Sequence, residues 1–205
     1  SSAASDVYKR QITASQVFNM PVEMVTPTMR SRAKAVNFGI VYGIGAYSLA
    51  KDIKVTNKEA SKYIKDYLAH YSGVDEYMKN VVEKAKRDGY VETMFGRRRY
   101  LPELSSGKHM MRAFGERVAR NMPIQGTAAD IIKIAMIKVD ERMKKEGLQA
   151  RLILQVHDEL IGEAPENEKE TVAKLLQDEM ENAVKLSVPL TADAAVGRTW
   201  YDAKK

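Results

Sequence analysis

The stretch RLILQVHDELIGEAP, residues 151–165, restricts the fold of this chain more than any other segment. Two short apolar runs, 152–154 and 160–161, lie on either side of His157-Asp158-Glu159. Short runs of leucine and β-branched residues favour strands, so the pattern predicts a β-hairpin with the three polar residues at or near its turn. Adjacent carboxylates on a tight turn repel each other unless a positive group lies beside them. The hairpin therefore also predicts a site for a cation.

The rest of the chain reads mainly as helix. Thr26-Pro27 supplies an N-cap and a first-turn proline for a helix that ends at Gly43. Thr56 and Glu59 have the spacing of a capping box, which opens a second helix to about residue 70. Further helices are expected at about 74–87, 108–122, 124–146 and 167–186, with a break or kink at Pro123.

Two other segments predict strands. Residues 90–104 alternate around Gly96 and indicate a hairpin, and VPLTADAAV, residues 188–196, reads as a last strand. The predicted class is α+β: a mostly helical region followed by a part with a small antiparallel sheet.

Composition narrows the class of protein without selecting a function. The chain is 44% hydrophobic and 29% charged, which is ordinary for a globular protein, and no run of about eighteen apolar residues predicts a membrane span. The absence of cysteine excludes disulfides and thiolate metal sites. A net charge of +6 and a pI near 9.3 fit a polyanionic partner, but many proteins with such an excess have none.

The first predicted helix carries a stripe of four functional side chains. Arg30, Lys34, Phe38 and Tyr42 follow one another at intervals of four, so they lie along one slowly turning face. Cations near a helix N-terminus oppose the helix dipole unless an anion joins them. A triphosphate on the two cations, with its sugar and base on the two aromatics, matches this order. The alternative is an amphipathic helix with core aromatics and solvated cations.

A second polar set follows on the 108–146 region. Arg117 and Asn121 share a helix face, and Gln125 follows Pro123. Such side chains suit hydrogen bonds to base edges or sugar oxygens, although surface polarity explains them equally well. The run 97–99 of three arginines is either solvated or in contact with phosphate. Residues 43–48 approach a dinucleotide fingerprint, but they follow a helix and are interpreted as a helix end and turn.

Three kinds of chemistry are conceivable for His157-Asp158-Glu159. A zinc site would need more histidine or a cysteine, and a nucleophilic dyad would need a serine or cysteine on a strained elbow. A hard cation such as Mg²⁺ fits best, because it takes one or two carboxylates together with water and phosphate oxygens. A two-ion site would need a further aspartate from elsewhere, and this chain shows no second acidic turn on a strand.

Taken together, these motifs resemble the C-terminal part of the family A (DNA polymerase I) DNA polymerases, from about Ile12 to Lys205. RSRAKAVNFGIVYG is similar to the nucleotide-binding fingers helix, ERVARNMPIQGTAAD to the segment contacting template-primer, and QVHDEL to the family's motif C. TMFGRRRYLPEL and the ending GRTWYDAKK are also of the family's type. The resemblance implies fingers over 26–107, the C-terminal palm over 108–205, and a palm-to-fingers connection over 12–25.

For the nucleotide, the resemblance implies that Arg30 and Lys34 bind the triphosphate, with Lys34 also a proton donor to pyrophosphate. Phe38 would pack on the sugar, where a tyrosine goes with tolerance of dideoxynucleotides. Tyr42 would stack near the template base. The family often has a second arginine where this chain has Ser31, which puts one auxiliary contact in doubt.

For DNA and metal, the resemblance implies that Arg117, Asn121 and Gln125 line the duplex near the primer end, with His157 at the primer terminus. Asp158 would ligate two Mg²⁺ ions, and Glu159 would support them. The expected function is template-directed transfer of a dNTP to a primer 3′ hydroxyl in DNA replication and repair, by a monomer in the bacterial cytoplasm, associated with the nucleoid and with no membrane.

The partner aspartate in the family lies in motif A, just upstream of ITASQVF, so we expect this chain to be a fragment that lacks motif A and the thumb and is inactive alone. SSAASDVYKRQ, residues 1–11, resembles the translation of a transposase-type sequencing adapter and is expected to be non-native. Two alternatives stay open: a phage-type single-subunit RNA polymerase, whose motif reads His-Asp-Ser, and a non-catalytic nucleic-acid-binding module.

Overall fold

The computed structural model describes residue 15, residues 21–26, 29 and 36, and residues 39–204. The chain forms two compact units that divide between Gly126 and Thr127, inside the long helix α6 (His109–Lys145). Each unit is described by itself, and the functional division into fingers and palm stays a prediction. None of the described helices is long and apolar enough to cross a membrane.

The predicted end of the first helix is confirmed. After the short 3-10 helix η1 (Val22–Met24), the described residues 39–41 are helical. The N–H of Ile44 donates to the carbonyl of Gly39 at 2.7 Å, and that of Gly43 to Ile40 at 2.9 Å. This bonding pattern, with a left-handed Gly43 at φ 76°, is the Schellman ending that glycine favours.

Helix α3 (Ala46–Ile53) corrects the expectation of a simple turn over residues 43–48. It begins directly after Gly45, and its apolar positions recur at helical spacing. Leu49 and Ile53 are fully buried, and they pack with Val36 and Ile40 in one cluster. Burial of this face explains why a glycine-rich opening leads into a helix.

Two further helices agree with their predicted starts and stops. In α4 (Asn57–His70), the Thr56 hydroxyl accepts from the N–H of Glu59, and the Glu59 carboxylate accepts from the N–H of Thr56 at 2.8 Å. This capping box is confirmed. Helix α5 (Ser72–Asp88) ends at Gly89, which has φ 76°.

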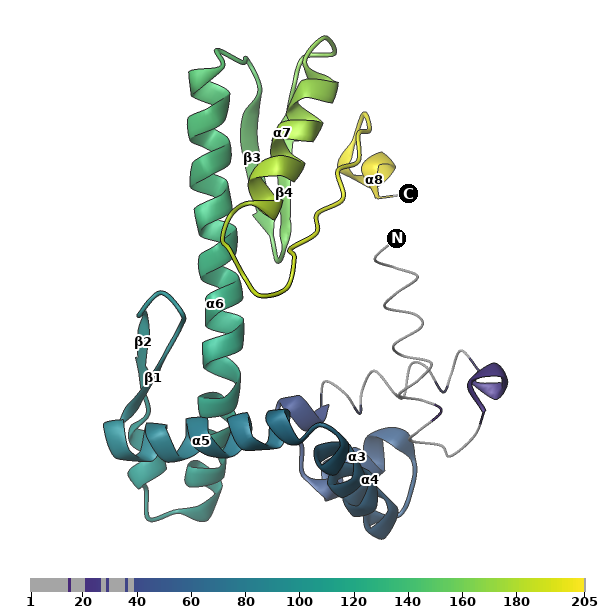
Figure 1. Cartoon of the computed structure of the whole chain (residues 1–205), viewed down its shortest axis with the longest axis vertical. Helices are drawn as coiled ribbons and strands as arrows, with labels where there is room; N and C mark the ends of the chain where they lie inside the picture. The colour runs from purple at the N-terminus through teal and green to yellow at the C-terminus, as the bar shows by residue number, and fades with distance from the viewer. Residues whose placement is uncertain (1–14, 16–20, 27–28, 30–35, 37–38, 205) are drawn as a thin grey trace. The chain divides into compact units, whose positions relative to one another are not determined.

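The predicted hairpin at residues 90–104 is confirmed in its strands. β1 (Tyr90–Glu92) pairs antiparallel with β2 (Arg98–Tyr100), and the connecting loop holds Gly96 at φ 78°. The 3-10 helix η2 (Pro102–Ser105) follows. Figure 1 shows this hairpin beside α6. Buried residues of α5, the hairpin, η2 and α6 form the second core cluster: Val82, Ala85, Val91, Leu101, Leu104 and Ala119.

Helix α6 is continuous through Pro123, so of the predicted break or kink the break is wrong, and the kink stays a prediction. A proline removes one backbone donor, which here would have served the carbonyl of Ala119. Ala119 is fully buried, and Val118 and Met122 pack against the same cluster. This packing before the proline, together with the hydrogen bond from Arg97 to the Gly126 carbonyl just after it, holds the helix in place where local propensity would end it.

The second unit contains the His-Asp-Glu hairpin that the sequence predicts. β3 (Arg151–Val156) pairs antiparallel with β4 (Glu159–Glu163), with a register shift between Leu152 and Leu154. Helix α7 (Lys169–Glu181) follows, and the short α8 (Trp200–Ala203) lies near the C-terminus (Figure 1). The core of this unit joins α6, the hairpin and α7 through Val139, Met143, Ala150, Val172 and Leu175.

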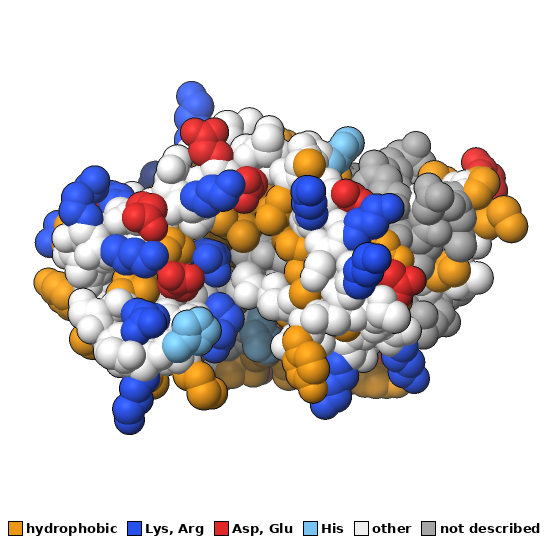
Figure 2. Space-filling view, turned by 90° about the horizontal axis from the view of Figure 1, so that it is seen from below, with side chains coloured by type: hydrophobic (Ala, Val, Ile, Leu, Met, Phe, Trp, Pro, Cys, Tyr) orange, Lys and Arg blue, Asp and Glu red, His pale blue; other side chains and the backbone are white. Residues whose placement is uncertain are grey.

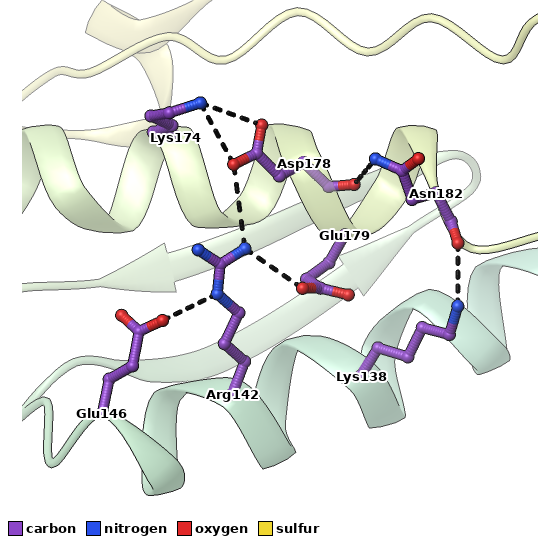
Figure 3. Close-up of polar contacts among 7 residues, drawn as sticks. All are labelled: Lys138, Arg142, Glu146, Lys174, Asp178, Glu179 and Asn182. Carbon is purple, nitrogen blue, oxygen red and sulfur yellow. Dashed lines mark hydrogen bonds and ion pairs between the residues drawn. The ribbon is translucent and has the colours of Figure 1, made fainter.

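Charged side chains also join α6 to α7 (Figure 3). Arg142 donates from Nη1 to Glu179 at 3.1 Å and from Nε to Glu146 at 2.8 Å. These carboxylates raise the pKa of Arg142, with the hydrogen bond to Glu146 as the largest cause. Lys138 Nζ donates to the carbonyl of Asn182 at 2.8 Å. The last turn of α7 is thus held on α6.

The end of the chain departs from expectation. Helix α7 stops at Glu181 rather than near residue 186, and residues 188–196 form no strand. The N–H of Ala192 donates to the Glu181 carboxylate at 3.1 Å instead of to a strand. Within the described ranges, β3 pairs only with β4. A strand needs a neighbour with which to exchange hydrogen bonds, and VPLTADAAV has none there.

Candidate nucleotide and nucleic-acid site

One continuous face of α6 presents the predicted duplex-contacting residues. Arg117, Asn121 and Gln125 lie four residues apart within the part of α6 that belongs to the first unit. Arg117 and Gln125 are exposed, and Asn121 is half-buried. Gln125 had been expected beyond a break, but the unbroken helix places all three along one stripe.

Arg117 and Asn121 differ in their surroundings on this face. The guanidinium carbon of Arg117 lies 5.8 Å from the ring centroid of Phe114, which is itself exposed. The side-chain oxygen of Asn121 is buried and has no hydrogen-bond partner among the described residues. An unsatisfied buried acceptor costs free energy until a donor reaches it, so this amide is the least satisfied polar group of the three.

The end of the first helix packs against the same part of α6. A Cβ placed on Gly43 would lie only 2.9 Å from Arg120 Nη1 and 3.7 Å from Arg117 Cγ. The positive φ favours glycine at this position, while the Arg120 guanidinium is the far end of a flexible side chain and could move. Tyr42 directly precedes Gly43 and is half-buried. The structure therefore brings Gly43, the residue after Tyr42, close to Arg117, although the two lie far apart in the sequence.

Three predicted nucleotide contacts, Arg30, Lys34 and Phe38, lie outside the described residues. Their roles stay predictions. Ser31 also lies outside the described residues, so the doubt about one auxiliary contact there stays untested.

The arginine run at residues 97–99 does not act as one patch. Arg97 donates to the carbonyl of Gly126 on α6 at 2.9 Å, so it holds the β1–β2 hairpin on that helix. Arg98 pairs with Glu92 at 3.4 Å and covers the Tyr90 ring at 4.5 Å. Arg99 is exposed. The sequence could not distinguish these three roles.

In the second unit, His157 and Asp158 form the two-residue turn between Val156 and Glu159. His157 has φ 54°, a left-handed conformation in which histidine is enriched. The side chain of Gln155 donates to the His157 carbonyl at 2.6 Å and braces the turn. Asp158 is exposed, so its carboxylate is open to a ligand.

The positive group beside these carboxylates is a residue that the sequence interpretation missed. Lys204 Nζ lies 3.3 Å from Glu159 Oε2 and 4.6 Å from the ring centroid of Trp200. The signal in the sequence was weak, because a lysine some forty-five positions away carries no spacing that would connect it to Glu159.

The donor set at the turn fits a hard cation through Asp158. Mg²⁺ takes one or two carboxylates, and the exposed Asp158 offers an uncommitted one. Glu159 has one oxygen engaged by Lys204. In the part of the chain that the structure describes, no group of three or more His, Cys, Asp or Glu side chains could hold a metal by itself.

On the face drawn in Figure 2, Lys and Arg side chains are distributed widely, with Asp and Glu side chains between them. On this face the basic side chains form no separate patch.

Comparison with known proteins adds an independent observation. The sequence model of DNA polymerase family A matches residues 2–202. The chain belongs to this family. The matched range includes most of residues 1–11, whose adapter origin stays a prediction.

Three relatives with high similarity are DNA polymerases. The chain is 54% identical over 192 residues to DNA polymerase I of Bacillus caldotenax and 55% identical to that of Geobacillus stearothermophilus, covering 94% of this chain. Over 96% of its length it matches the polymerase domain of Pol1 from M. smegmatis, solved with DNA primer-template and dNTP, at 45% identity and a TM-score of 0.89. These family A relatives give no support to the RNA polymerase alternative.

The chain spans only part of each family member. It covers 22% of either bacillar DNA polymerase I and 35% of the M. smegmatis polymerase chain. Membership of the family is therefore shown, while the activity and partners of the whole protein are matters of proposal.

Proposed function

We propose that this chain supplies the nucleotide-binding fingers and the C-terminal palm of a DNA polymerase that transfers a dNTP to a primer 3′ hydroxyl. The observation that carries the proposal is the packing of Gly43 against Arg117 and Arg120. It brings the last residues of the proposed fingers helix, which include Tyr42, close to the part of α6 that carries Arg117. A template base on Tyr42 and a duplex on α6 are then neighbouring ligands of one surface.

The nucleotide roles extend this proposal along the first helix. Arg30 and Lys34 bind the triphosphate, Lys34 passes a proton to the departing pyrophosphate, and Phe38 packs on the sugar. Support comes from the buried pair Val36 and Ile40, which marks the core side of the segment. Because Val36 and Ile40 are four residues apart, a helix would place both on one side, which leaves its other sides available for a nucleotide.

At the other unit, Asp158 holds the divalent cation and Glu159 stands beside it, while His157 lies at the primer terminus. Two Mg²⁺ ions, when bound, lower the barrier by favouring deprotonation of the primer hydroxyl and stabilising the leaving oxygen. The protein's part is orientation: the braced left-handed turn aims Asp158 outward. Lys204 neutralises Glu159 and so limits repulsion between the adjacent carboxylates.

We propose further that the 205-residue chain does not extend a primer by itself, because Asp158 needs a second acidic ligand from another strand. The exposed apolar side chains of Ile153 and Leu154 support this, since they lie on β3, whose described partner is β4 alone. A strand with an open edge and an exposed apolar face suits a further palm strand. Monomeric action in the cytoplasm, at the bacterial nucleoid, belongs to the same proposal.

A graft tests the proposal directly. Residues 12–205 replace the corresponding part of Geobacillus stearothermophilus DNA polymerase I, and primer extension is measured with Mg²⁺ and four dNTPs. We expect the hybrid to extend the primer, Asp158→Ala to abolish extension, and the isolated chain to show none. An inactive but folded hybrid would contradict the polymerase assignment. Extension by the isolated chain, lost in Asp158→Ala, would contradict its predicted incompleteness.

A further inference from the structure

A cavity of about 330 Å³ lies within the first unit, between α5, β1 and the Pro123 turn of α6. Its volume falls in the range of small-ligand sites, about 300–1,000 Å³. None of the residues discussed for nucleotide, duplex or metal lines it. Tyr77, Asn80 and Lys84 reach it from one face of α5, since their spacing is i, i+3, i+7.

The walls of the cavity are aromatic and held in place. Tyr90 lines it from β1, with the Arg98 guanidinium 4.5 Å from its ring centroid and the Tyr100 ring 5.8 Å away at an angle of 60°. Tyr77 is 40% exposed and so presents part of its ring to a ligand. A ring that is fixed beforehand loses little entropy when a planar ligand stacks on it.

The polar groups at the cavity favour an anionic strand that carries a flat base. Lys84 Nζ lies 3.5 Å from Glu92, and Arg98 Nε lies 3.4 Å from the same carboxylate, so two cations meet one anion. The excess positive charge suits a phosphate at the rim. The Asn80 side chain both donates and accepts, as recognition of a base edge requires.

We propose that this cavity, here called the α5–β1 pocket (Tyr77, Asn80, Lys84, Tyr90), binds an unpaired base of single-stranded DNA continuous with the template. The proposal rests on the DNA polymerase function proposed above, because that function supplies a strand with unpaired bases. Stacking on tyrosine and a cationic rim are the general means by which proteins hold single strands without reading their sequence.

The test compares a blunt duplex with the same duplex carrying a short 5′ template overhang. A second version of the overhang carries 2-aminopurine. Binding to the full 205-residue chain is followed by anisotropy, and stacking by quenching of 2-aminopurine. Tyr77→Ala removes the ring, Tyr77→Phe keeps it, and Tyr71→Ala is the matched control. Tyr71 is 36% exposed in the same unit and does not line the pocket. Circular dichroism verifies that each variant is folded.

We expect the overhang to strengthen binding, and Tyr77→Ala to weaken overhang binding about tenfold and abolish quenching. Blunt-duplex binding should change less than about twofold, because surface substitutions away from a contact have small effects. Tyr77→Phe and Tyr71→Ala should behave like the natural chain. The proposal is overturned if the overhang adds no affinity, or if Tyr77→Ala weakens both substrates equally. If the natural chain does not bind the blunt duplex but still quenches 2-aminopurine in the overhang, the polymerase function is contradicted and the pocket is supported.

Discussion

Gly126 lies on α6 directly after Gln125, at the point where the β1–β2 hairpin packs most tightly on that helix. A Cβ added there would lie 2.7 Å from Thr93 Cγ2 and 3.4 Å from Arg97 Nη2. Thr93 is only 4% exposed, and its hydroxyl accepts from the N–H groups of Phe95 and Arg97, both at 3.2 Å. The methyl group that meets the new Cβ therefore cannot swing away freely.

The sign of the change in unfolding free energy caused by Gly126→Ala follows from two opposing contributions, helix propensity and steric overlap. Alanine in a helix interior is more favourable than glycine by about 1 kcal/mol. Overpacking costs about 1–3 kcal/mol, and rotation of Thr93 would instead sacrifice two hydrogen bonds worth about 1 kcal/mol each. With a cost of about 2 kcal/mol by either route and a gain of about 1 kcal/mol, we expect Gly126→Ala to lower the free energy of unfolding by about 1 kcal/mol.

Urea unfolding of the chain, followed by circular dichroism, measures this change. Gly73→Ala is the control, because a Cβ at Gly73 of α5 meets nothing within 4 Å, and it should be neutral or stabilising. Thr93→Ser removes the methyl group and keeps the acceptor, so the double variant should be more stable than Gly126→Ala alone. A Gly126→Ala chain as stable as the natural one, or no rescue by serine, would refute the steric argument.

The remaining predictions concern the fingers, a helix cap and the tail. In the grafted polymerase, Lys34→Ala should reduce kcat/KM for dNTP about 10- to 150-fold, since a charge-assisted contact is worth roughly 1.5–3 kcal/mol, and unchanged steady-state kinetics would contradict it. Phe38→Tyr should increase dideoxynucleotide incorporation in competition assays, and no increase would remove Phe38 from the sugar. Hydrogen bonds from Thr56 lower the pKa of Glu59 below its ordinary value of 4.5. The capping box therefore stabilises α4 fully above pH 4.5, and this stabilisation is lost as the pH falls through the lower pKa of the folded state. Thr56→Ala should thus destabilise α4 by about 1 kcal/mol at neutral pH and less in acid, as urea titrations at both pH values would detect. Deleting residues 1–11 should change the unfolding free energy by less than about 0.5 kcal/mol, and a larger loss would place them in the fold.

Local chemistry was sufficient wherever a few neighbouring residues decide the backbone. The Thr56–Glu59 capping box, the glycine ending at Gly43 and the turn at His157-Asp158 were all predictable, because their hydrogen bonds or backbone angles involve residues within a few positions. The family of the protein also followed from sequence, because the motifs occur in the family's order, and the family match confirms that membership.

Tertiary structure decided the features in which local preference and packing disagree. Pro123 reads as a helix break, but buried Ala119 and its neighbours keep α6 intact and so place Gln125 on the same face as Arg117. VPLTADAAV has strand propensity and forms no strand, because a strand exists only with a partner.

The same holds for the candidate site. Sequence alone named Tyr42, Arg117, Asp158 and Glu159, because their residue types and motif context identify the chemistry. It could not show that Gly43 packs on Arg120 or that Lys204 neutralises Glu159. Both contacts join residues separated by dozens of positions, and no local pattern encodes such a pairing. Residue identity therefore indicated which chemistry to expect, and long-range packing determined which of the described residues meet.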